Sequence, residues 1–395
     1  MSELVPVLWI CGPPGVGKSA VGWELHTQLV DAGVNAGYVD LDQLGMCYPE
    51  SASDPGRHGM QATNLAAVVA NFEAAGISCV VTSGLLDPRR DAPVDPLPRT
   101  AVTVCRLRAD EDVLRARFVG RGAQAELVDE VLREAAVLDA SDFADSCVDT
   151  TDLTVEEVVR LMRTRIGQWP GLVARASVAG PAPRRISHAP GPILWVCGAT
   201  GVGKSTVGWQ LFEHARAAGV PAAFVDLDQL GHFRVGDTGV DGDVDVDTGV
   251  DVHQVRANNL AAVWDTYRAG GARCLVVNGP VDDPSAVHTY ANALPAATLT
   301  VCRLHAGPEE LTRRILRRGR GGSWWQPGDP LRGQPDSVLK QVANDAARGA
   351  ADLEQAGVGD HRVDTDGRTV EQVVQAVLAH TGAWPQASSR VRARR

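Results

Sequence analysis

The sequence predicts an α/β fold with two parallel sheets, each flanked by helices. Two observations carry this prediction. A glycine-rich stretch that ends in Lys-Ser occurs twice, at residues 12–19 and 198–205, and each copy follows a short apolar run. Apolar strand-like runs then alternate with helical segments in both halves, which is the order of a parallel sheet covered on both faces. A chain of 395 residues is long enough for two domains, each with its own core.

The two halves correspond almost from end to end. The same offset of 186 positions relates Lys18 to Lys204 and Asp40 to Asp226, and the offset grows toward the C-terminus because the second half carries insertions. A repeat of this length indicates a duplicated domain rather than a solenoid unit. The predicted organisation is a first domain at 1–170, a linker rich in Ala, Pro and Arg at 171–192, a second domain at 193–386 and a basic tail at 387–395.

Each half repeats one order of predicted elements. A strand leads into the glycine-rich stretch. A helix follows and ends at a glycine, and further strands alternate with helices. The expected strands are 7–11, 37–42, 78–82, 101–106 and 146–149 in the first half, and 193–197, 223–228, 273–277, 299–303 and 361–364 in the second. The expected helices include 18–30 and 204–218, and two that contain 64–68 and 259–263. A ligand is expected at the carboxyl ends of such strands.

Composition excludes several classes of protein. The net charge of −10 argues against a nucleic-acid binder, and no apolar run approaches the length of a membrane span. The N-terminus lacks the pattern of a secretory signal, so we expect a cytoplasmic protein with no membrane partner. The cysteines lie in apolar runs and lack zinc-ligand spacing. An Asp-, Val- and Gly-rich insert at 237–251 is predicted to be a flexible acidic loop rather than a calcium site, because it lacks the EF-hand register.

The two glycine-rich stretches have the composition of a phosphate-binding loop. Glycines let consecutive backbone N–H groups face one anion, and the following helix adds the positive end of its dipole. Lys18 and Lys204 would reach the β- and γ-phosphates of ATP, and the hydroxyls of Ser19 and Ser205 would hold Mg²⁺. The alternative is a glycine-rich turn with a solvated lysine, which would have to arise twice. The predicted nucleotide-binding residues are Gly12, Gly15, Gly17, Lys18 and Ser19, and Gly198, Gly201, Val202, Gly203, Lys204, Ser205 and Thr206.

A second motif, Val-Asp-Leu-Asp-Gln-Leu-Gly, begins at Val39 and again at Val225. If it continues a strand, its two aspartates point to one side, beside the phosphate loop. One carboxylate could then order the Mg²⁺ and the other accept a proton from an attacking hydroxyl. The alternative is a turn or helix-cap aspartate. The predicted catalytic carboxylates are Asp40, Asp42, Asp226 and Asp228, with Asp226 also a metal ligand.

Arginines cluster after the fourth strand of the second half. Arg313, Arg314, Arg317, Arg318 and Arg320 follow Arg303, and Gly- and Pro-rich sequence comes after them. Because arginine matches phosphoryl oxygens in fork geometry, we predict a lid that brings Arg314 and Arg318 to the phosphoryl group. The alternative is a solvated basic helix face. The first half keeps Arg106, Arg117 and Arg121 in register but lacks an eighteen-residue insertion after this point.

A fourth feature differs between the halves. Arg256 and Asn259 lie three positions apart on one predicted helix face, where together they could grip an anionic or polyol acceptor. The first half has Gln61 and Asn64 in these places. The predicted substrate-binding residues are therefore Asp228, Arg256, Asn259 and Asn64. The alternative is a helix start with ordinary polar caps.

Together these residues resemble the small-molecule P-loop kinases, a group that includes adenylylsulfate, shikimate, gluconate and nucleoside monophosphate kinases. The resemblance implies two P-loop NTPase domains of the kinase type that transfer the γ-phosphate of ATP to an acceptor hydroxyl with Mg²⁺. It also implies that Asp226 or Asp228 acts at the acceptor and that Arg314 or Arg318 belongs to the lid. The third strands end in Ser-Gly and Asn-Gly without an acidic residue, which disfavours a motor or AAA-type function.

The leading hypothesis is a tandem kinase of a small-molecule hydroxyl, with the second half the more complete site. The runner-up is a nucleotide-binding regulatory module with little transfer activity. A kinase acting on polynucleotide ends is a third hypothesis, disfavoured by the negative charge. The identity of the acceptor, the activity of each half, the preference for ATP over GTP and a homo-oligomeric state are left open.

Overall fold

The chain forms two compact α/β units, each built from both halves of the sequence. The computed structural model describes residues 4–86, 97, 99–120, 125–171, 184–233, 244–245, 250–281, 283–321, 329–382 and 384–385. Unit 1 contains residues 1–45, 53–183 and 229–255, and unit 2 contains 46–52, 184–228 and 256–395. The sequence predicts two contiguous domains. In the structure, segment 46–52 of the first half belongs to unit 2 and segment 229–255 of the second half belongs to unit 1.

Unit 1 has a six-stranded sheet in the order β6-β5-β1-β4-β2-β9. All neighbours are parallel except β9, which runs antiparallel to β2. Helix α1 packs against α5, and α3 against α4. The strands and helices drawn from the first half are β1 (Val5–Cys11), α1 (Lys18–Asp31), β2 (Ala36–Asp40), α2 (His58–Ala74), β4 (Cys79–Ser83), β5 (Thr100–Arg108), α3 (Glu111–Gly120), α4 (Val128–Asp139), β6 (Ser146–Asp149) and α5 (Val155–Ile166). Three short strands come from the second half: β9 (His232–Phe233), β10 (Val244–Asp245) and β11 (Val250–Asp251).

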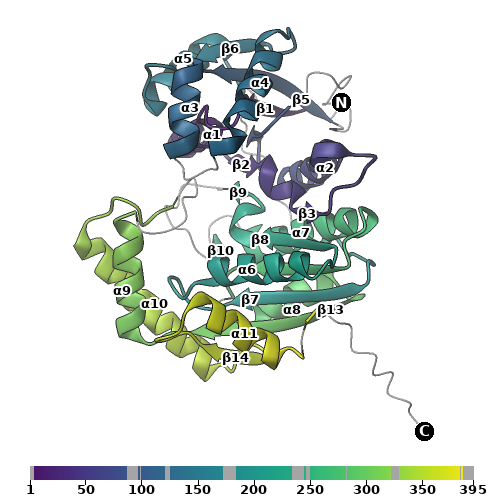
Figure 1. Cartoon of the computed structure of the whole chain (residues 1–395), viewed down its shortest axis with the longest axis vertical. Coiled ribbons are helices and arrows are strands. Elements are labelled where there is room, and N and C mark those ends of the chain that lie inside the picture. Colours follow the sequence, from purple (N-terminus) through teal and green to yellow (C-terminus); the bar gives the residue numbers. More distant parts are fainter. Residues whose placement is uncertain are drawn as a thin grey trace. The chain divides into compact units, whose positions relative to one another are not determined.

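Unit 2 repeats this order as β14-β13-β7-β12-β8-β3, with β3 antiparallel at the edge. Helices α6 and α11 pack together over one face of the sheet (Figure 1). The elements of this unit are β3 (Cys47–Tyr48), β7 (Gly191–Cys197), α6 (Lys204–Ala217), β8 (Ala222–Asp226), α7 (Val252–Ala269), β12 (Cys274–Asn278), α8 (Pro284–Ala293), β13 (Ala297–His305), α9 (Pro308–Gly319), α10 (Asp336–Gln355), β14 (His361–Asp364) and α11 (Val370–His380).

The central strands are buried because apolar side chains line both of their faces. In unit 1 the face under α1 and α5 holds Leu8, Ile10 and Val81, and Met162 of α5 packs there with no exposed surface. In unit 2 the equivalent face holds Leu194, Val196 and Val276. Seven of the eight cysteines are buried and free, as the apolar runs around them predict. These cores hold the carboxyl ends of the strands, and the phosphate loops between them, in fixed positions.

An edge strand from the other half of the sequence completes each sheet. In unit 1, Gly37 and Tyr38 of β2 pair with Phe233 and His232 of β9. In unit 2, Ala223 and Ala222 of β8 pair with Cys47 and Tyr48 of β3. Both exchanged strands follow the Asp-Leu-Asp-Gln motif by a few residues, and two-residue strands carry almost no sequence signal. Sequence patterns therefore miss them.

The predicted strands 37–42 and 223–228 end two residues early in the structure. Strands β2 and β8 end at Asp40 and Asp226, and the chain continues as the 3-10 turns η1 (Leu41–Gly45) and η4 (Leu227–Gln229). The reason lies in the first aspartate of each pair. Its carboxylate accepts a hydrogen bond from the backbone N–H two residues later, at 3.0 Å in unit 1 and 3.1 Å in unit 2. This bond turns the chain out of the strand.

Part of the predicted linker is packed structure. The backbone N–H of Arg185 donates to Oδ1 of Asn258 at 2.9 Å, and the indole of Trp264 donates to the carbonyl of Ala189 at 3.0 Å. Ser187 between them is fully buried and bonds to Asp265. Residues 172–183 and most of the insert 237–251 lie outside the described residues, as does Arg121. No helix within the described ranges combines the length and apolar character that a membrane crossing requires.

Candidate nucleotide and acceptor site

The phosphate loop of each unit joins the first strand to the first helix at the carboxyl edge of the sheet, as predicted. In unit 2 the loop runs from β7 to α6, whose N-cap is Gly203 in a left-handed conformation with φ of 102°. Gly198 has φ of 134°, and a Cβ on it would lie 2.4 Å from the carbonyl oxygen of Leu304. Gly12 of unit 1 meets Leu107 at the same 2.4 Å. Only glycine fits these positions, so the sequence fixes the loop shape that exposes N–H groups to an anion.

The loop lysine of each unit lies over its own loop. Nζ of Lys204 donates to the carbonyls of Gly198 at 2.9 Å and Ala199 at 3.2 Å, and Lys18 does the same to Gly12 and Pro13. Burial lowers the pKa of Lys204, while the charges of Asp228 and Asp226 act in the opposite direction. The ammonium group thus lies over the loop, where the charges of both predicted carboxylates act on it.

The loop serine and the first aspartate form a pair in both units. The hydroxyl of Ser205 donates to Oδ2 of Asp226 at 3.1 Å, and Ser19 donates to Asp40 at 2.8 Å. Burial, with the charge of Asp228 nearby, raises the pKa of Asp226 to about 6, and Asp40 beside Asp42 is raised to about 6 for the same reasons. A hydroxyl and a carboxylate are hard oxygen ligands, so Ser19 with Asp40 and Ser205 with Asp226 fit Mg²⁺ that takes its other ligands from phosphate and water.

The second aspartate lies at the open side of the site. Asp228 is half exposed, and its carboxylate is 3.6 Å from a guanidinium nitrogen of Arg256 on α7. Nε of Arg256 is buried without a hydrogen-bond partner among the described residues. Asn259, one turn further along α7, is fully buried. The structure therefore brings the predicted pair Asp228 and Arg256 together.

Unit 1 differs at this place. Gln61 is buried against Gly45, where its amide leaves no room for a side chain on the glycine. Asn64 donates from Nδ2 to the carbonyl of Leu44 at 2.7 Å, so this amide fixes the turn that carries Asp42. No arginine corresponds to Arg256. Gln61 of unit 1 therefore stands at the position that Arg256 holds in unit 2.

The predicted lid arginines lie on α9, where their contacts are specific. Arg314 donates to the carbonyl of Val202 at 2.8 Å, to Oγ1 of Thr365 at 2.9 Å and to its carbonyl at 3.0 Å. It also pairs with Glu310. Arg318 pairs with Asp329 at 2.8 Å, and its charge contributes to the lowered pKa of Lys204. Arg314 thus ties the phosphate loop to the loop after β14, and the charge of Arg318 acts on Lys204.

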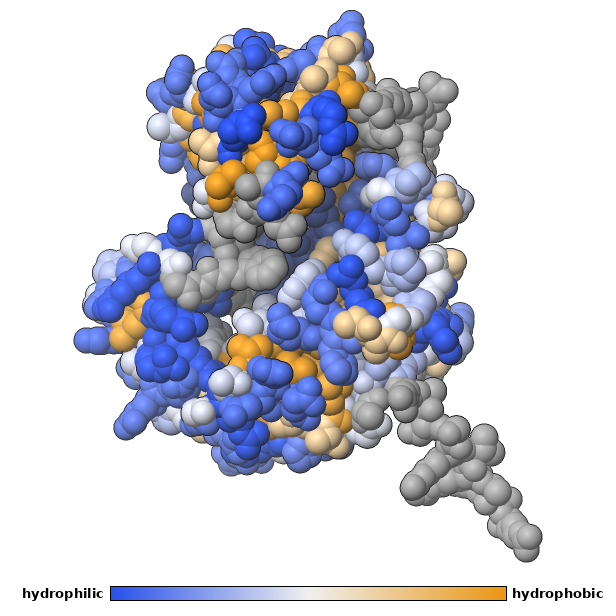
Figure 2. Space-filling model, viewed as in Figure 1, coloured by the Kyte–Doolittle hydropathy of each residue, from blue (hydrophilic) through white to orange (hydrophobic). Residues whose placement is uncertain are grey.

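The other basic residues of α9 face outward. Arg313 and Arg320 pair with Glu310 and Asp336 on the surface, and Figure 2 shows the hydrophilic outer face of α9 and α10. Arg303 is buried and bonds to the carbonyl of Val358 and to Glu354. These arginines pair with carboxylates of the same unit and make no contact with the phosphate loop in the described structure. Residues 322–328, within the predicted lid, lie outside the described part.

Sequence patterns missed Thr365, the threonine that Arg314 contacts, and its counterpart Thr150 in unit 1. In unit 1, Arg117 donates to Oγ1 and the carbonyl of Thr150 at 2.9 Å each, and the Thr150 hydroxyl donates to the carbonyl of Val16 at 3.3 Å. Thr150 and Thr365 both follow a Val-Asp pair at the end of the last strand. This repeated Val-Asp-Thr was the available signal.

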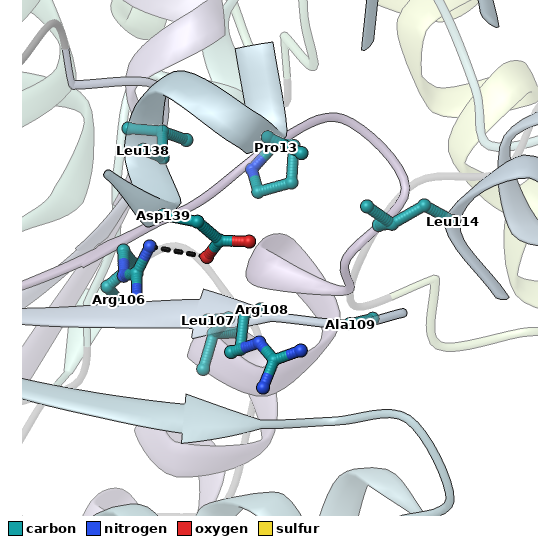
Figure 3. Close-up of a pocket in the computed structure, with 9 residues that line it drawn as sticks. Pro13, Arg106, Leu107, Arg108, Ala109, Leu114, Leu138 and Asp139 are labelled. Atoms are coloured by element: carbon teal, nitrogen blue, oxygen red, sulfur yellow. Dashed lines mark hydrogen bonds and ion pairs between the residues drawn. The ribbon is translucent and has the colours of Figure 1, made fainter. Parts of the chain in front are cut away.

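A hollow beside the phosphate loop of unit 1 is not a ligand site. It lies between β5, α4 and Pro13, is partly open to solvent and encloses no space wide enough for a water molecule. Figure 3 shows Arg106 reaching across it to Asp139, and the two side chains are 2.7 Å apart. The hollow is therefore packed structure behind the loop.

Comparison with known proteins gives a family-model match over the first part of the chain. Residues 8–137 match a family model described as an AAA domain. No curated protein matches the chain. The description names a domain and not an activity, so the expectation that disfavours a motor or AAA-type function stays a prediction; Ser83 and Asn278 end the third strands without an acidic residue.

Several solved structures are similar at low identity. A tunicamycin resistance protein from Deinococcus radiodurans is 20% identical, with a TM-score of 0.34, over 41% of this chain and 96% of that one. A gluconokinase from Sinorhizobium meliloti 1021 is 23% identical, with a TM-score of 0.31, over 50% and 94%. A shikimate kinase from Bacteroides thetaiotaomicron is 16% identical, with a TM-score of 0.31, over 48% and 98%.

The loop geometry, the strand order and the family match agree with one another. Each unit has a glycine loop between a central parallel strand and a helix, a lysine and serine at the start of that helix, and an aspartate at the end of a nearby strand. The chain therefore consists of two units with the P-loop NTPase fold, and residues 8–137 carry its match to the AAA-domain family model.

Proposed function

We propose that unit 2 transfers the γ-phosphate of ATP to a hydroxyl group of a small anionic molecule. The observation that carries this proposal is the pairing of Asp228 with Arg256 at 3.6 Å, beside Lys204 and Asp226. A nucleotide-binding site alone has no use for a carboxylate and a guanidinium at its open side. An acceptor hydroxyl needs the carboxylate, and an acceptor anion needs the guanidinium.

The residues take separate roles in this reaction. Lys204 and the loop N–H groups bind the phosphates, and Ser205 with Asp226 would hold Mg²⁺, which offsets the phosphate charge when bound. Arg256 binds the anionic group of the acceptor and leaves its hydroxyl beside Asp228. The hydroxyl oxygen forms a bond to the γ-phosphorus, the bond from that phosphorus to the β-γ bridging oxygen breaks, and ADP leaves. Asp228 accepts the hydroxyl proton.

We infer a different role for unit 1, in which nucleotide is bound and turnover is slow or absent. The supporting observation is Gln61, which is packed against Gly45 where unit 2 has its arginine. Lys18, Ser19 and Asp40 keep the nucleotide and metal side of the site complete. Unit 1 would then be a nucleotide-binding regulator of the same chain.

The test is ATP turnover by the full chain with Mg²⁺ and a fractionated cell extract as acceptor source. Lys204→Ala should abolish the turnover that extract stimulates, whereas Lys18→Ala should lower it without abolishing it, because unit 1 regulates unit 2. Arg256→Gln, which copies unit 1, should remove the stimulation by extract while binding of MgADP is unchanged. If no fraction stimulates turnover by the wild-type chain, the transfer proposal is wrong and a binding module takes its place.

A further inference from the structure

The segment that contains β9 connects the two proposed sites. It leaves unit 2 after Asp228 and rejoins it at Arg256, and its strand β9 pairs in the sheet of unit 1. Asp228 and Arg256 are also the two members of the acceptor pair. Asp228 and Arg256 therefore flank a segment whose strand β9 pairs with β2 of unit 1.

The segment is anchored tightly in unit 1. The ring of Phe233 lies 5.2 Å from that of Phe72, and His232 packs edge-on against Trp23 at 4.7 Å. Gly231 has φ of 129°, and a Cβ on it would lie 2.3 Å from the ring of Phe72. Backbone pairing to Gly37 and Tyr38 adds to these contacts. The pairing with β2 and the packing on α2 thus set the position and the direction of β9.

The strand that receives β9 carries the metal side of the unit 1 site. Strand β2 ends at Asp40, which accepts the hydrogen bond of Ser19. Tyr38, the partner of His232, donates its hydroxyl to the carbonyl of Ser19 at 3.4 Å and bonds to Ser83 at 2.8 Å. A nucleotide with Mg²⁺ that draws Ser19 and Asp40 toward itself acts directly on this strand.

The connection from β9 back to Asp228 is short. Only Gln229 and Leu230 lie between Asp228 and Gly231, and both are buried. Three residue steps span at most about 11 Å even when fully extended. We therefore expect a shift of β9 to reach Asp228 through this short, buried link.

We propose that nucleotide binding in unit 1 orders the acceptor pair of unit 2 through β9, with Phe233 as the positioning residue. This inference rests on the proposed function for the meaning of the pair, and its mechanism is a coupling between two binding sites. Nucleotide in unit 1 fixes β2, β2 fixes β9, and β9 holds Asp228 opposite Arg256.

Hydrogen exchange of the full chain tests the coupling without any acceptor. The chain carries Lys204→Ala, so that MgADP binds only to unit 1. On adding MgADP we expect slower exchange of backbone amides at 36–42 in unit 1, and also about fivefold slower exchange at 226–228 and 256–260 in unit 2. Adding Phe233→Ala should remove the response in unit 2 and keep that at 36–42. Phe233→Leu, which still packs on Phe72, should restore it.

Two controls make the result decisive. The double variant Lys18→Ala, Lys204→Ala should show no response to MgADP in either unit. Val119→Ala, an exposed truncation in unit 1 away from β9, should behave as its parent. The proposal is overturned if MgADP leaves the unit 2 amides unchanged in the Lys204→Ala chain, or if their response survives Phe233→Ala. Hydrogen exchange measures no phosphate transfer. The coupling can therefore be confirmed or contradicted independently of the proposed function.

Discussion

At the scale of single residues, the site depends on a carboxylate kept in an unfavourable environment. Asp226 is almost fully buried, so its charged form lacks water, and Asp228 adds a second negative charge. Lys204 and the Ser205 hydroxyl offset only part of this cost. A metal ion at Asp226 would relieve it. The same holds for Asp40 in unit 1.

This environment predicts a pH dependence of nucleotide binding. The pKa of Asp226 is about 6, so below pH 6 the carboxyl is protonated and cannot ligate Mg²⁺. MgADP affinity of the Lys18→Ala chain should therefore fall below pH 6, by up to about tenfold per pH unit, in calorimetric titrations. Asp226→Asn should bind weakly at all pH values. If the MgADP affinity of the Lys18→Ala chain, which keeps Asp226, were constant from pH 5 to 7, the assignment of Asp226 as a metal ligand would be wrong.

The raised pKa of Asp226 also determines whether its contribution to the free energy of unfolding rises or falls with pH. Between pH about 4 and 6 the unfolded chain has lost the proton of this carboxyl while the folded chain keeps it. Without Mg²⁺ the contribution of Asp226 to the free energy of unfolding should therefore decrease as the pH rises through this window. Chemical denaturation of wild type and Asp226→Asn across the window measures it, and the variant should lack this contribution.

Arg314 is predicted to matter for stability as well as binding. Arg314→Ala would leave the carbonyl of Val202 and the hydroxyl and carbonyl of Thr365 without this donor, at a cost of about 1–3 kcal/mol in the free energy of unfolding. Arg317→Ala on the exposed face of the same helix is the matched control, with a change within about 0.5 kcal/mol. Urea titration of the two variants compares them. Equal stabilities would show that the tie to the phosphate loop is not a stabilising contact.

At the scale of elements, the phosphate loop is set by backbone geometry. Gly198→Ala would put a methyl group 2.4 Å from the carbonyl of Leu304, so we expect about 1–3 kcal/mol lower stability and loss of MgADP binding in unit 2. Gly349→Ala is the control, because this glycine lies within α10 with no atom within 4 Å of the added Cβ. It should raise stability by about 0.5–1 kcal/mol. Thermal unfolding of both variants decides between these outcomes.

Most elements could be predicted from the sequence because their signals are local. Glycines with Lys-Ser fix the loop and the start of α1 and α6, and apolar runs fix the parallel strands. The ends of β2 and β8 could not be predicted, because the turn depends on a hydrogen bond from Asp42 or Asp228 to the preceding aspartate. The exchange of β3 and β9 could not be predicted either, because a two-residue strand takes its partner from tertiary contacts. Arg314 and Thr365 needed the structure to bring them together.

At the scale of the whole molecule, the exchange makes each half of the sequence part of both units. A protease site placed between Pro183 and Arg184 should therefore cut the chain without separating its pieces, because β3 and β9 each lie in a sheet of the other half. The pieces should co-elute in gel filtration after cleavage. Tyr48→Ala with Phe233→Ala should weaken this association, and separation of the unaltered pieces would contradict the exchange.

The exchange also constrains how this sequence can change over generations. Phe72 and Phe233 lie in different halves yet pack in one unit, and Tyr48 and Phe212 do the same in the other. A substitution in one half is therefore selected together with its partner far along the gene. A recombination event that replaced one half with that of a distant relative would mismatch both sheet edges at once, so the two halves are inherited as a pair.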